Sequence, residues 1–231
     1  MLFFNLENLF NINLFEVAKY EVMDEKNVFD IKAKTWDDNP VRMKLVSEVW
    51  DEIVRHVDFA KVSRALDYGC GTGLLGFKAI KDVDVMTFCD TSDGMLEQVK
   101  QKKAFYGTEN ATVLKADFIK DALPEESIDL IMSMLVLHHV HELNEIIARF
   151  AEALNTGGYF CWIDLESEDG SFHGNNDGVA HLGFSRSGTE KLLQDNGFEI
   201  VYHSNRFYME KTTGDNTKRF PVFLLIGKKQ S

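Results

Sequence analysis

The sequence predicts an α/β fold: a doubly wound, mostly parallel sheet of seven strands that ends in an antiparallel hairpin. Three observations support this prediction. Apolar runs of strand length alternate with helical stripes from residue 39 onward, a glycine-rich turn joins the first run to the next helix, and a short polar turn separates the last two runs. The 231 residues suffice for one large domain with an appendage.

Residues 1–22 are rich in Phe and Leu, and Asn and Glu interrupt them. Their apolar side chains recur at helical spacing, which predicts an amphipathic cap helix; alternatively, translation begins at Met23 and the stretch is an extension without a role. The longest apolar run is too short for a membrane span, and no basic residue precedes it as in a secretory signal. We therefore expect an N-terminal extension or cap over 1–38 and one α/β domain over 39–231.

The first half of the domain begins with a helix. Asn39 and Pro40 supply its cap and first turn, and an apolar stripe follows to Val57. A capping residue, Ser92, predicts a later helix that runs to about Ala104. Around it we expect strands over Arg64–Gly69, Asp84–Asp90 and Ala111–Ala116, with a further helix over Thr72–Ile80.

The second half continues the alternation. A strand over Ser127–Leu135 precedes a helix from about Leu143 to Leu154, which Gly157 and Gly158 close, and Tyr159–Leu165 forms the next strand. Residues 166–186 are polar and long for a connection, which favours a functional loop. The final elements are a helix after the capping box Ser187–Glu190 and an antiparallel hairpin of Glu199–Met209 with Phe220–Gly227.

Charge and cysteine content exclude several classes of partner. The chain has 25 Lys and Arg against 37 Asp and Glu, a net charge of −12, and no basic run. Nucleic acid and anionic membrane surfaces are therefore not expected partners. Three widely spaced cysteines form neither a disulfide framework nor a metal-binding motif, which favours a cytoplasmic location.

The segment ALDYGCGTGLLG places a glycine-rich turn between the first strand and the next helix. It matches the dinucleotide pattern G-x-G-x-x-G, which is weak evidence for a ligand by itself. The carboxylate of Asp67, two residues before the first glycine, would repel a pyrophosphate and attract a cationic amine. S-adenosylmethionine carries such an amine and a sulfonium. Taken alone, Asp67 is also compatible with a helix-capping role.

The run Asp67-Tyr68-Gly69-Cys70-Gly71-Thr72-Gly73 resembles motif I of the class I S-adenosylmethionine-dependent methyltransferases. The resemblance extends over about Val41 to Gly227 and implies that family's Rossmann-like fold, with S-adenosylmethionine as cofactor and S-adenosylhomocysteine as product. It implies that the methionyl part is held by Asp67 and the backbone of Gly69 and Gly71. Cys70 and Gly73 are further cofactor-binding candidates in the loop, with a small filler of the loop as the alternative for Cys70.

The same resemblance assigns the nucleoside end of the cofactor. Asp90 matches the acidic residue that binds the ribose hydroxyls, with Thr91 and Met95 lining the adenosine. Asp117 and Phe118 match the pair that meets the adenine. Met134, at the end of the fourth strand, corresponds to the position that lines the methyl-transfer end.

Candidates for the acceptor end are fewer. In LVLHHVHE, His138 and His139 follow the fourth strand; His139 is the candidate general base and His138 a candidate substrate contact, although both are also compatible with plain turn residues. The acidic loop matches no ligand spacing, so no metal is expected. We expect further substrate contacts from Trp36, Arg42, Phe172 and His173, with a surface charge as the alternative for Arg42.

The predicted function is methyl transfer from S-adenosylmethionine to a small-molecule O, N or C acceptor. The fourth strand ends in SMLV and lacks the N/D-P-P-Y/F tetrapeptide of the enzymes that methylate amino groups of DNA bases or glutamine. Two alternatives remain. A nicotinamide oxidoreductase would have the same turn but not Asp67, whereas a non-catalytic S-adenosylmethionine-binding module or partner-dependent methyltransferase subunit would retain every cofactor residue.

Overall fold

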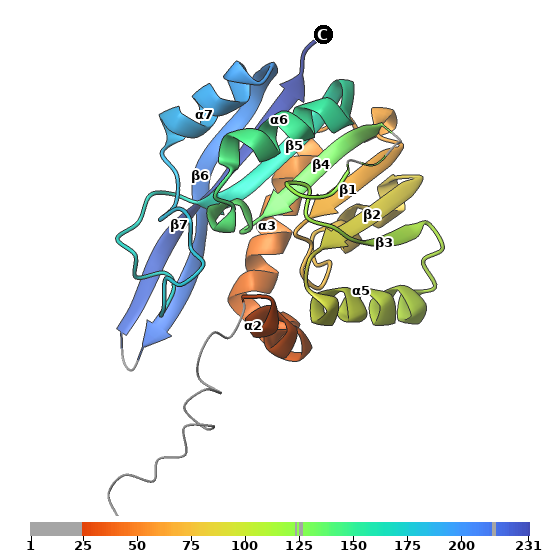
Figure 1. The fold of residues 1–231 in the computed structure, drawn as a ribbon. Helices are drawn as coiled ribbons and strands as arrows, with labels where there is room; N and C mark the ends of the chain where they lie inside the picture. Colours follow the sequence, from red (N-terminus) through yellow and green to blue (C-terminus); the bar gives the residue numbers. More distant parts are fainter. Residues whose placement is uncertain (1–24, 123, 125–126, 214–215) are drawn as a thin grey trace, which may run out of the picture.

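The computed structural model describes residues 25–122, 124, 127–213 and 216–231, so the apolar stripe predicted over 1–22 lies outside the described residues. Seven strands form one sheet in the order β3-β2-β1-β4-β5-β7-β6 (Figure 1). The strands are β1 (Arg64–Tyr68), β2 (Val85–Asp90), β3 (Ala111–Lys115), β4 (Ile128–Met134), β5 (Leu154–Leu165), β6 (Phe198–Thr213) and β7 (Asn216–Lys229).

Pairing directions confirm the predicted doubly wound sheet. Strands β1 to β5 pair in parallel, and β7 lies antiparallel to both β5 and β6. The chain adds β2 and β3 on one side of β1 and then returns to place β4 on its other side. This reversal of strand order between β1 and β4 is the position where ligands bind in open α/β sheets.

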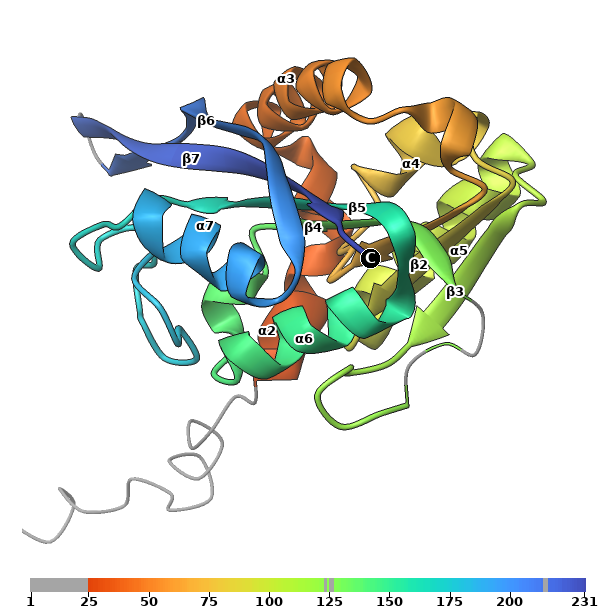
Figure 2. The same cartoon turned by 90° about the horizontal axis from the view of Figure 1, so that it is seen from above.

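Helices cover both faces of the sheet. Figure 2 shows α3 and α4 on one side and α6 and α7 on the other. Side chains of α3, α4 and α5 belong to one buried apolar cluster, and those of α6 and α7 belong to a second. The α-helices are α2 (Glu25–Lys32), α3 (Pro40–His56), α4 (Gly76–Ala79), α5 (Asp93–Tyr106), α6 (Leu143–Ala153) and α7 (Arg186–Asp195). Short 3-10 helices are η1 (Ala33–Asp38), η2 (Phe59–Lys61), η3 (Ile80–Asp82) and η4 (Leu137–His139).

Two predicted helix starts are confirmed. The side chain of Asn39 accepts hydrogen bonds from the backbone N–H groups of Val41 and Arg42 at 2.9 and 3.1 Å, and α3 begins at Pro40. The hydroxyl of Ser92 accepts a hydrogen bond from the N–H of Met95 at 3.1 Å at the start of α5.

Four local predictions are wrong. The helix expected over Thr72–Ile80 begins only at Gly76, because Gly73 has a left-handed φ of 81°. Gly157 and Gly158 do not close a helix: α6 has already ended and β5 has begun at Leu154. In α7 the N-cap is Ser185 rather than Ser187, with its hydroxyl accepting from Gly188 N–H at 3.2 Å.

The fourth concerns the polar turn predicted between the last two strands. Thr212 pairs with Thr217 and Thr213 with Asn216, so both strands extend to the hairpin tip.

The first described elements, α2 and η1, pack against α5, below the carboxyl ends of the parallel strands in Figure 1. Asp30 accepts hydrogen bonds from the backbone N–H of Gly94 at 2.8 Å and the hydroxyl of Ser92 at 2.5 Å. Because these groups lie at the N-terminus of α5, the Asp30 carboxylate caps a helix 64 residues away from it. Among the described residues, no helix is both long and apolar enough to cross a membrane.

Candidate functional site

The glycine loop after β1 depends on left-handed backbone. Gly69, Gly71 and Gly73 have φ of 66°, 54° and 81°, a region that side chains with a Cβ rarely adopt. Gly69 is also required because there is no room for a side chain: a Cβ there would lie 2.4 Å from a methyl carbon of Val136. The loop therefore packs directly against the chain that follows β4.

Asp67 ends β1 beneath this loop and is 2% exposed. Its Oδ2 accepts a hydrogen bond from the backbone N–H of Gly76, the first residue of α4, at 2.9 Å. Burial raises the pKa of Asp67 to about 7, the Gly76 N–H opposes this rise, and the nearby Asp90 carboxylate adds to it. The helix-capping contact is thus present, on a buried carboxyl group that is partly ionised near pH 7.

Asp90 ends β2 and holds the centre of the loop. Its Oδ2 accepts from the N–H of Gly71 at 2.8 Å, and its Oδ1 accepts from the N–H of Ser92 at 2.9 Å. Burial raises the pKa of Asp90, and these backbone N–H groups lower it. Thr91 is half-buried, and Met95 is buried with its sulfur 3.9 Å from where a Cβ of Gly71 would lie. The ends of β1 and β2 thus place two carboxylates around one loop.

The other predicted cofactor residues differ in their surroundings. Cys70 is buried, and burial raises the pKa of its thiol. Asp117 accepts from the N–H of Ile119 at 3.1 Å and pairs with Lys120 at 2.7 Å, within the turn after β3. The ring of Phe118 is fully buried against Tyr68, with centroids 5.2 Å apart. Met134 is half-buried at the end of β4.

Trp36 lies close to the glycine loop and Arg42 packs on Trp36. The indole nitrogen of Trp36 is 3.5 Å from where a Cβ of Gly71 would lie. The Arg42 guanidinium stacks on the Trp36 ring at 3.8 Å and donates to the Trp36 carbonyl at 2.5 Å. Asp37 completes this cover, because it accepts from the Thr72 hydroxyl at 2.5 Å and pairs with Lys102 at 2.5 Å. The predicted surface-charge alternative for Arg42 does not describe its packing on Trp36.

The histidines after β4 lie beside this loop. His138 is 1% exposed, and its Nδ1 lies 2.6 Å from Oδ1 of Asp164, a buried residue in β5. His139 contacts Gly178, with its Nδ1 2.9 Å from that carbonyl oxygen. His173, from the loop between β5 and α7, reaches His138 with its Nε2 3.2 Å from the Nε2 of His138. The fold thus brings His173, which the sequence placed in the acidic loop, to the two histidines predicted after the fourth strand.

Burial sets the protonation of two of these rings. It lowers the pKa of His139 to about 4 and that of His173 to about 3, and the mutual repulsion of the imidazoles lowers both further. Both are therefore neutral near pH 7. Phe172, a predicted substrate contact, is 6% exposed and packs against Phe220 with centroids 5.1 Å apart, so it supports the cluster from behind.

The end of β4 contains a strained residue. Leu135 has φ 57° and is the one non-glycine residue with positive φ in the part of the chain that the structure describes. Its N–H donates to the carbonyl of Ile163 in β5 at 2.8 Å, which holds the corner in place. Val136, which contacts Gly69, and the two histidines follow directly.

Sequence reasoning missed Asp30 and Asp164. Asp164 is a buried carboxylate near the end of β5, an apolar strand. The same pattern identified Asp67 and Asp90, so Asp164 could have been predicted from the sequence. For Asp30 we find no such signal, because its partners Ser92 and Gly94 lie far away in the chain.

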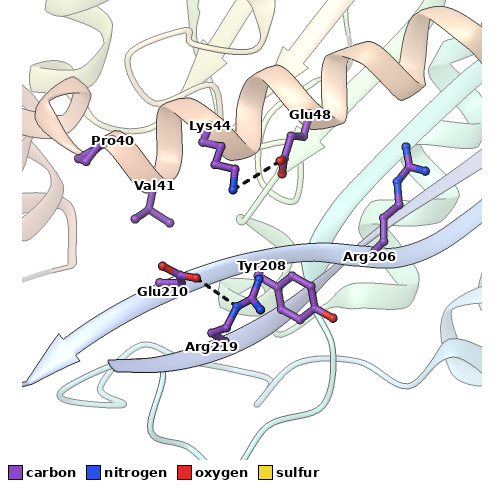
Figure 3. Close-up of a pocket in the computed structure, with 8 residues that line it drawn as sticks. All are labelled: Pro40, Val41, Lys44, Glu48, Arg206, Tyr208, Glu210 and Arg219. Carbon is purple, nitrogen blue, oxygen red and sulfur yellow. Dashed lines mark ion pairs between the residues drawn. The ribbon is translucent and has the colours of Figure 1, made fainter. Parts of the chain in front are cut away.

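A surface hollow of about 300 Å³ lies elsewhere, between α3 and the strands β6 and β7 (Figure 3). Its charged side chains are largely paired: Lys44 with Glu48 at 3.7 Å and Arg219 with Glu210 at 3.1 Å. The Arg219 guanidinium also stacks on Tyr208 at 4.2 Å. None of the predicted site residues lines this hollow, so the strand ends remain the candidate site.

Comparison with known proteins identifies related sequences. The sequence profile of a methyltransferase domain matches residues 65–158. An uncharacterized methyltransferase of Geobacillus sp. is 23% identical over 169 residues, 66% of this chain and 78% of that protein. A tRNA N(3)-cytidine methyltransferase of Homo sapiens is 28% identical, covering 62% of this chain and 57% of that protein. An aklanonic acid methyltransferase of a Streptomyces species is 27% identical, and the match covers 47% of this chain and 51% of that protein. The chain thus spans about half the length of the last two relatives.

Solved structures share the fold. The YcgJ protein from Bacillus subtilis superposes with a TM-score of 0.68 at 14% identity, covering 80% of this chain and 99% of that chain. A Haloferax volcanii chain, solved in a complex with a methyltransferase activator, has a TM-score of 0.64 at 20% identity. The match covers 91% of this chain and 100% of that chain. Magnesium protoporphyrin IX methyltransferase from Synechocystis, with bound S-adenosylhomocysteine, has a TM-score of 0.60 at 17% identity and covers 82% and 84%.

Proposed function

Because the chain belongs to the class I S-adenosylmethionine-dependent methyltransferases, we propose that it transfers the methyl group of this cofactor to a small-molecule O, N or C acceptor. S-adenosylhomocysteine is the other product. We assign this activity to the domain 39–231 and treat residues 1–38 as an N-terminal extension whose described part, 25–38, covers the site.

The observation that carries the proposal is the pair of carboxylates around the glycine loop. Asp67 and Asp90 lie at the ends of adjacent strands, and their carboxylates accept from the N–H of Gly76, where α4 begins, and of Gly71 in the loop, at 2.9 and 2.8 Å. A carboxylate offers about four acceptor positions, so each retains capacity for a ligand. Two acids suit an ammonium and a pair of ribose hydroxyls, whereas a pyrophosphate would be repelled. The left-handed Gly71, with Trp36 and Met95 close above it, forms a narrow cradle that a larger side chain would fill.

S-adenosylmethionine, when bound, supplies a methyl group made electrophilic by its sulfonium. We assign Asp67 and the loop residues Gly69, Cys70, Gly71 and Gly73 to its methionyl part. Asp90, Thr91 and Met95 would hold the ribose and adenosine, and Asp117 with the backbone of Phe118 the adenine. Met134 lies where the methyl-transfer end is expected. The chain's main contribution is then to place the acceptor in line with the methyl group.

The acceptor end is assigned to the histidines and their neighbours. We assign His139 as the general base. Its pKa is lowered to about 4, so it is neutral near pH 7 and, when its Nε2 binds no ion, can accept a proton as a weak base. His138 and His173 would contact the acceptor from the same cluster. Trp36 and Arg42 would enclose it from the other side, and Phe172 would support His173.

Two features favour a small acceptor over tRNA, the substrate named for the human relative. The net charge is −12, and the described acceptor end is formed by buried or half-buried residues and not by a basic surface. A partner-dependent subunit is a second candidate, which the Haloferax volcanii complex with an activator favours. The three free, buried cysteines suit a reducing cytoplasm.

The test begins with calorimetric titration of the full chain with S-adenosylmethionine, S-adenosylhomocysteine and NAD. Binding of the first two and not of NAD is the expected result, and binding of NAD alone would overturn the proposal. Release of S-adenosylhomocysteine is then followed with a panel of small phenols, amines and activated carbon acids, and with tRNA. Methylation of tRNA alone would contradict the proposed acceptor class.

A further inference from the structure

We propose that His138, His139 and His173 form a binding site for one divalent transition-metal ion, with zinc the ion that best suits them. Each residue offers one ring nitrogen, and these three nitrogens all lie within 4.8 Å of one another. His138 and His139 belong to η4, and His173 comes from the loop after β5, so only the folded chain brings them together. His138 and His139 are neighbours in the sequence and His173 lies 35 positions after His138, a spacing that matches no ligand motif, which explains why no metal was expected there.

Hydrogen bonds already fix the tautomers that a metal requires. The Nδ1 of His138 lies 2.6 Å from a carboxylate oxygen of Asp164, and the Nδ1 of His139 lies 2.9 Å from the carbonyl oxygen of Gly178. Both oxygens are acceptors, so each Nδ1 carries the hydrogen and the lone pair of the neutral ring is on Nε2. Metal-binding histidines are commonly held by a carboxylate or carbonyl in this way.

The separation of the nitrogens also suits a metal. The Nε2 atoms of His138 and His173 are 3.2 Å apart. Two nitrogens bound to a tetrahedral zinc at about 2.0–2.1 Å lie about 3.3 Å from each other. Without an ion, this contact needs a hydrogen between the two nitrogens, so that His173 donates to His138. The two arrangements predict different behaviour toward added metal.

The cluster is held rigidly. His138 is 1% exposed, and its carbonyl accepts from the N–H groups of both Ala180 and His181 at 2.9 Å, which ties the loop after β5 to η4. Within that loop, a carboxylate oxygen of Glu168 accepts from the N–H of Phe172 at 3.1 Å and so positions His173, the next residue. Ligands on such supports lose little conformational entropy when an ion binds.

Charge and ligand type select the ion. Asp164 places a buried carboxylate beside His138, while Lys211 and Lys32 are the cations that lower the pKa of His173, and Lys211 donates to the Phe172 carbonyl. Imidazole suits zinc, copper, nickel and iron, whereas magnesium and calcium prefer oxygen ligands. Three histidine ligands leave a fourth position for water or another ligand, as in catalytic zinc sites.

The location suggests a use for that fourth position. The rings of His139 and Phe29 are in edge contact, with centroids 5.8 Å apart. The ring of Phe29 in turn contacts that of Trp36, with centroids 6.0 Å apart, and Trp36 covers the glycine loop. An acceptor oxygen or nitrogen bound to the ion would be oriented toward the methyl group, and its pKa would be lowered by the charge of the ion. With the ion bound, the His139 lone pair would be occupied, so the ion would take the place of this imidazole in assisting loss of the acceptor's proton. This step rests on the proposed function; binding of the ion does not.

The test is metal binding by the full chain after treatment with a chelator. Calorimetric titration with zinc chloride is expected to give one equivalent per chain, cobalt(II) should give the absorption bands of a tetrahedral site, and magnesium chloride should give no binding. His173→Ala should weaken zinc binding by about 100-fold or more, because loss of an outer-shell partner alone costs about 10–100-fold. His141→Ala is the matched control, since His141 is exposed and outside the cluster.

His138→Ala removes a fully buried side chain, so His173→Ala and His173→Gln, with folding checked by circular dichroism, keep the test decisive. Absence of stoichiometric zinc binding, or unchanged affinity in His173→Ala, would overturn the proposal and favour the hydrogen-bonded cluster. The same protein is titrated with S-adenosylmethionine. Zinc binding without cofactor binding would contradict the proposed function alone, and the reverse result would contradict the metal site alone.

Discussion

Asp90 accepts a hydrogen bond from the backbone N–H of Gly71 at 2.8 Å, across 19 positions of the sequence. Asp90 ends β2 and Gly71 lies in the loop after β1, so the bond joins two neighbouring strand ends at the switch point of the sheet. Asp67 holds the far end of the same loop through Gly76. The loop is therefore shaped before a ligand binds, and a ligand that fits it loses less entropy on binding.

Substitution of Asp90 by Ala tests the ribose assignment. Loss of a charge-assisted contact should weaken binding of S-adenosylmethionine and adenosine by about 1.5–3 kcal/mol, roughly 10- to 150-fold. Asp93→Asn is the control, because its exposed carboxylate pairs with Lys115 at 2.5 Å, away from the loop. Calorimetry that finds normal adenosine affinity in Asp90→Ala would refute the assignment.

The raised pKa of Asp67 predicts a pH dependence of cofactor binding. Because this pKa is about 7, the carboxyl of the unliganded protein becomes protonated and neutral below that pH. An ammonium ligand prefers the ionised form, so affinity for S-adenosylmethionine should rise between about pH 5.5 and about pH 7, by up to about tenfold per unit. Asp67→Asn should bind weakly at every pH, and a slope that persists in this variant would assign the titration to another group.

The same pKa predicts a stability effect. A carboxyl whose pKa is raised by folding stabilises the native state fully below the unfolded-state value, 3.8, and this contribution is lost as the pH rises through about 7. Asp67→Asn removes the cost of holding a buried charge. The unliganded variant should therefore unfold at a higher temperature than the parent protein under mildly alkaline conditions, and an unchanged or lower melting temperature would speak against a buried, ionised Asp67.

Gly69→Ala separates backbone strain from crowding. Gly107, with φ 64° and nothing within 4 Å of a Cβ, is the control for strain alone, for which Ala costs about 1–2 kcal/mol. At Gly69 the added Cβ would also meet Val136 at 2.4 Å, adding about 1–3 kcal/mol of overpacking. Denaturant unfolding should show the difference, and Val136→Ala in the same chain should reduce it. Equal losses at the two glycines would contradict this packing.

Asp30→Ala should loosen the N-terminal cover. The substitution removes the acceptor of Gly94 N–H and the Ser92 hydroxyl, a capping loss of about 0.5–2 kcal/mol. Hydrogen exchange in residues 25–38 should become faster than in the parent chain. Asp38→Ala, at an exposed position of η1, should leave exchange unchanged. Identical exchange in the two variants would show that Asp30 does not hold α2 in place.

The sheet and the carboxylates near the glycine loop follow from local patterns, which is why they could be predicted. Apolar runs mark buried parallel strands, and each acid directly follows such a run. Contacts between distant segments have no local signature: the pairing of Asp164 with His138, and the approach of His173, depend on the path of the loop after β5. The cap of α7 shows the limit for local rules, since Ser185 and Ser187 both suit the pattern and tertiary packing selects Ser185.

Leu135 links the stability of the protein to its chemistry. A left-handed leucine costs about 1–2 kcal/mol, which the rest of the fold must offset. This conformation fixes the direction in which the chain leaves β4, so that Val136 contacts Gly69 and the two histidines that follow lie at the site. Leu135→Gly would relieve the strain and let the corner move. Selection for thermal robustness and selection for turnover would therefore act in opposite directions at this position, as expected where a protein exchanges stability for activity.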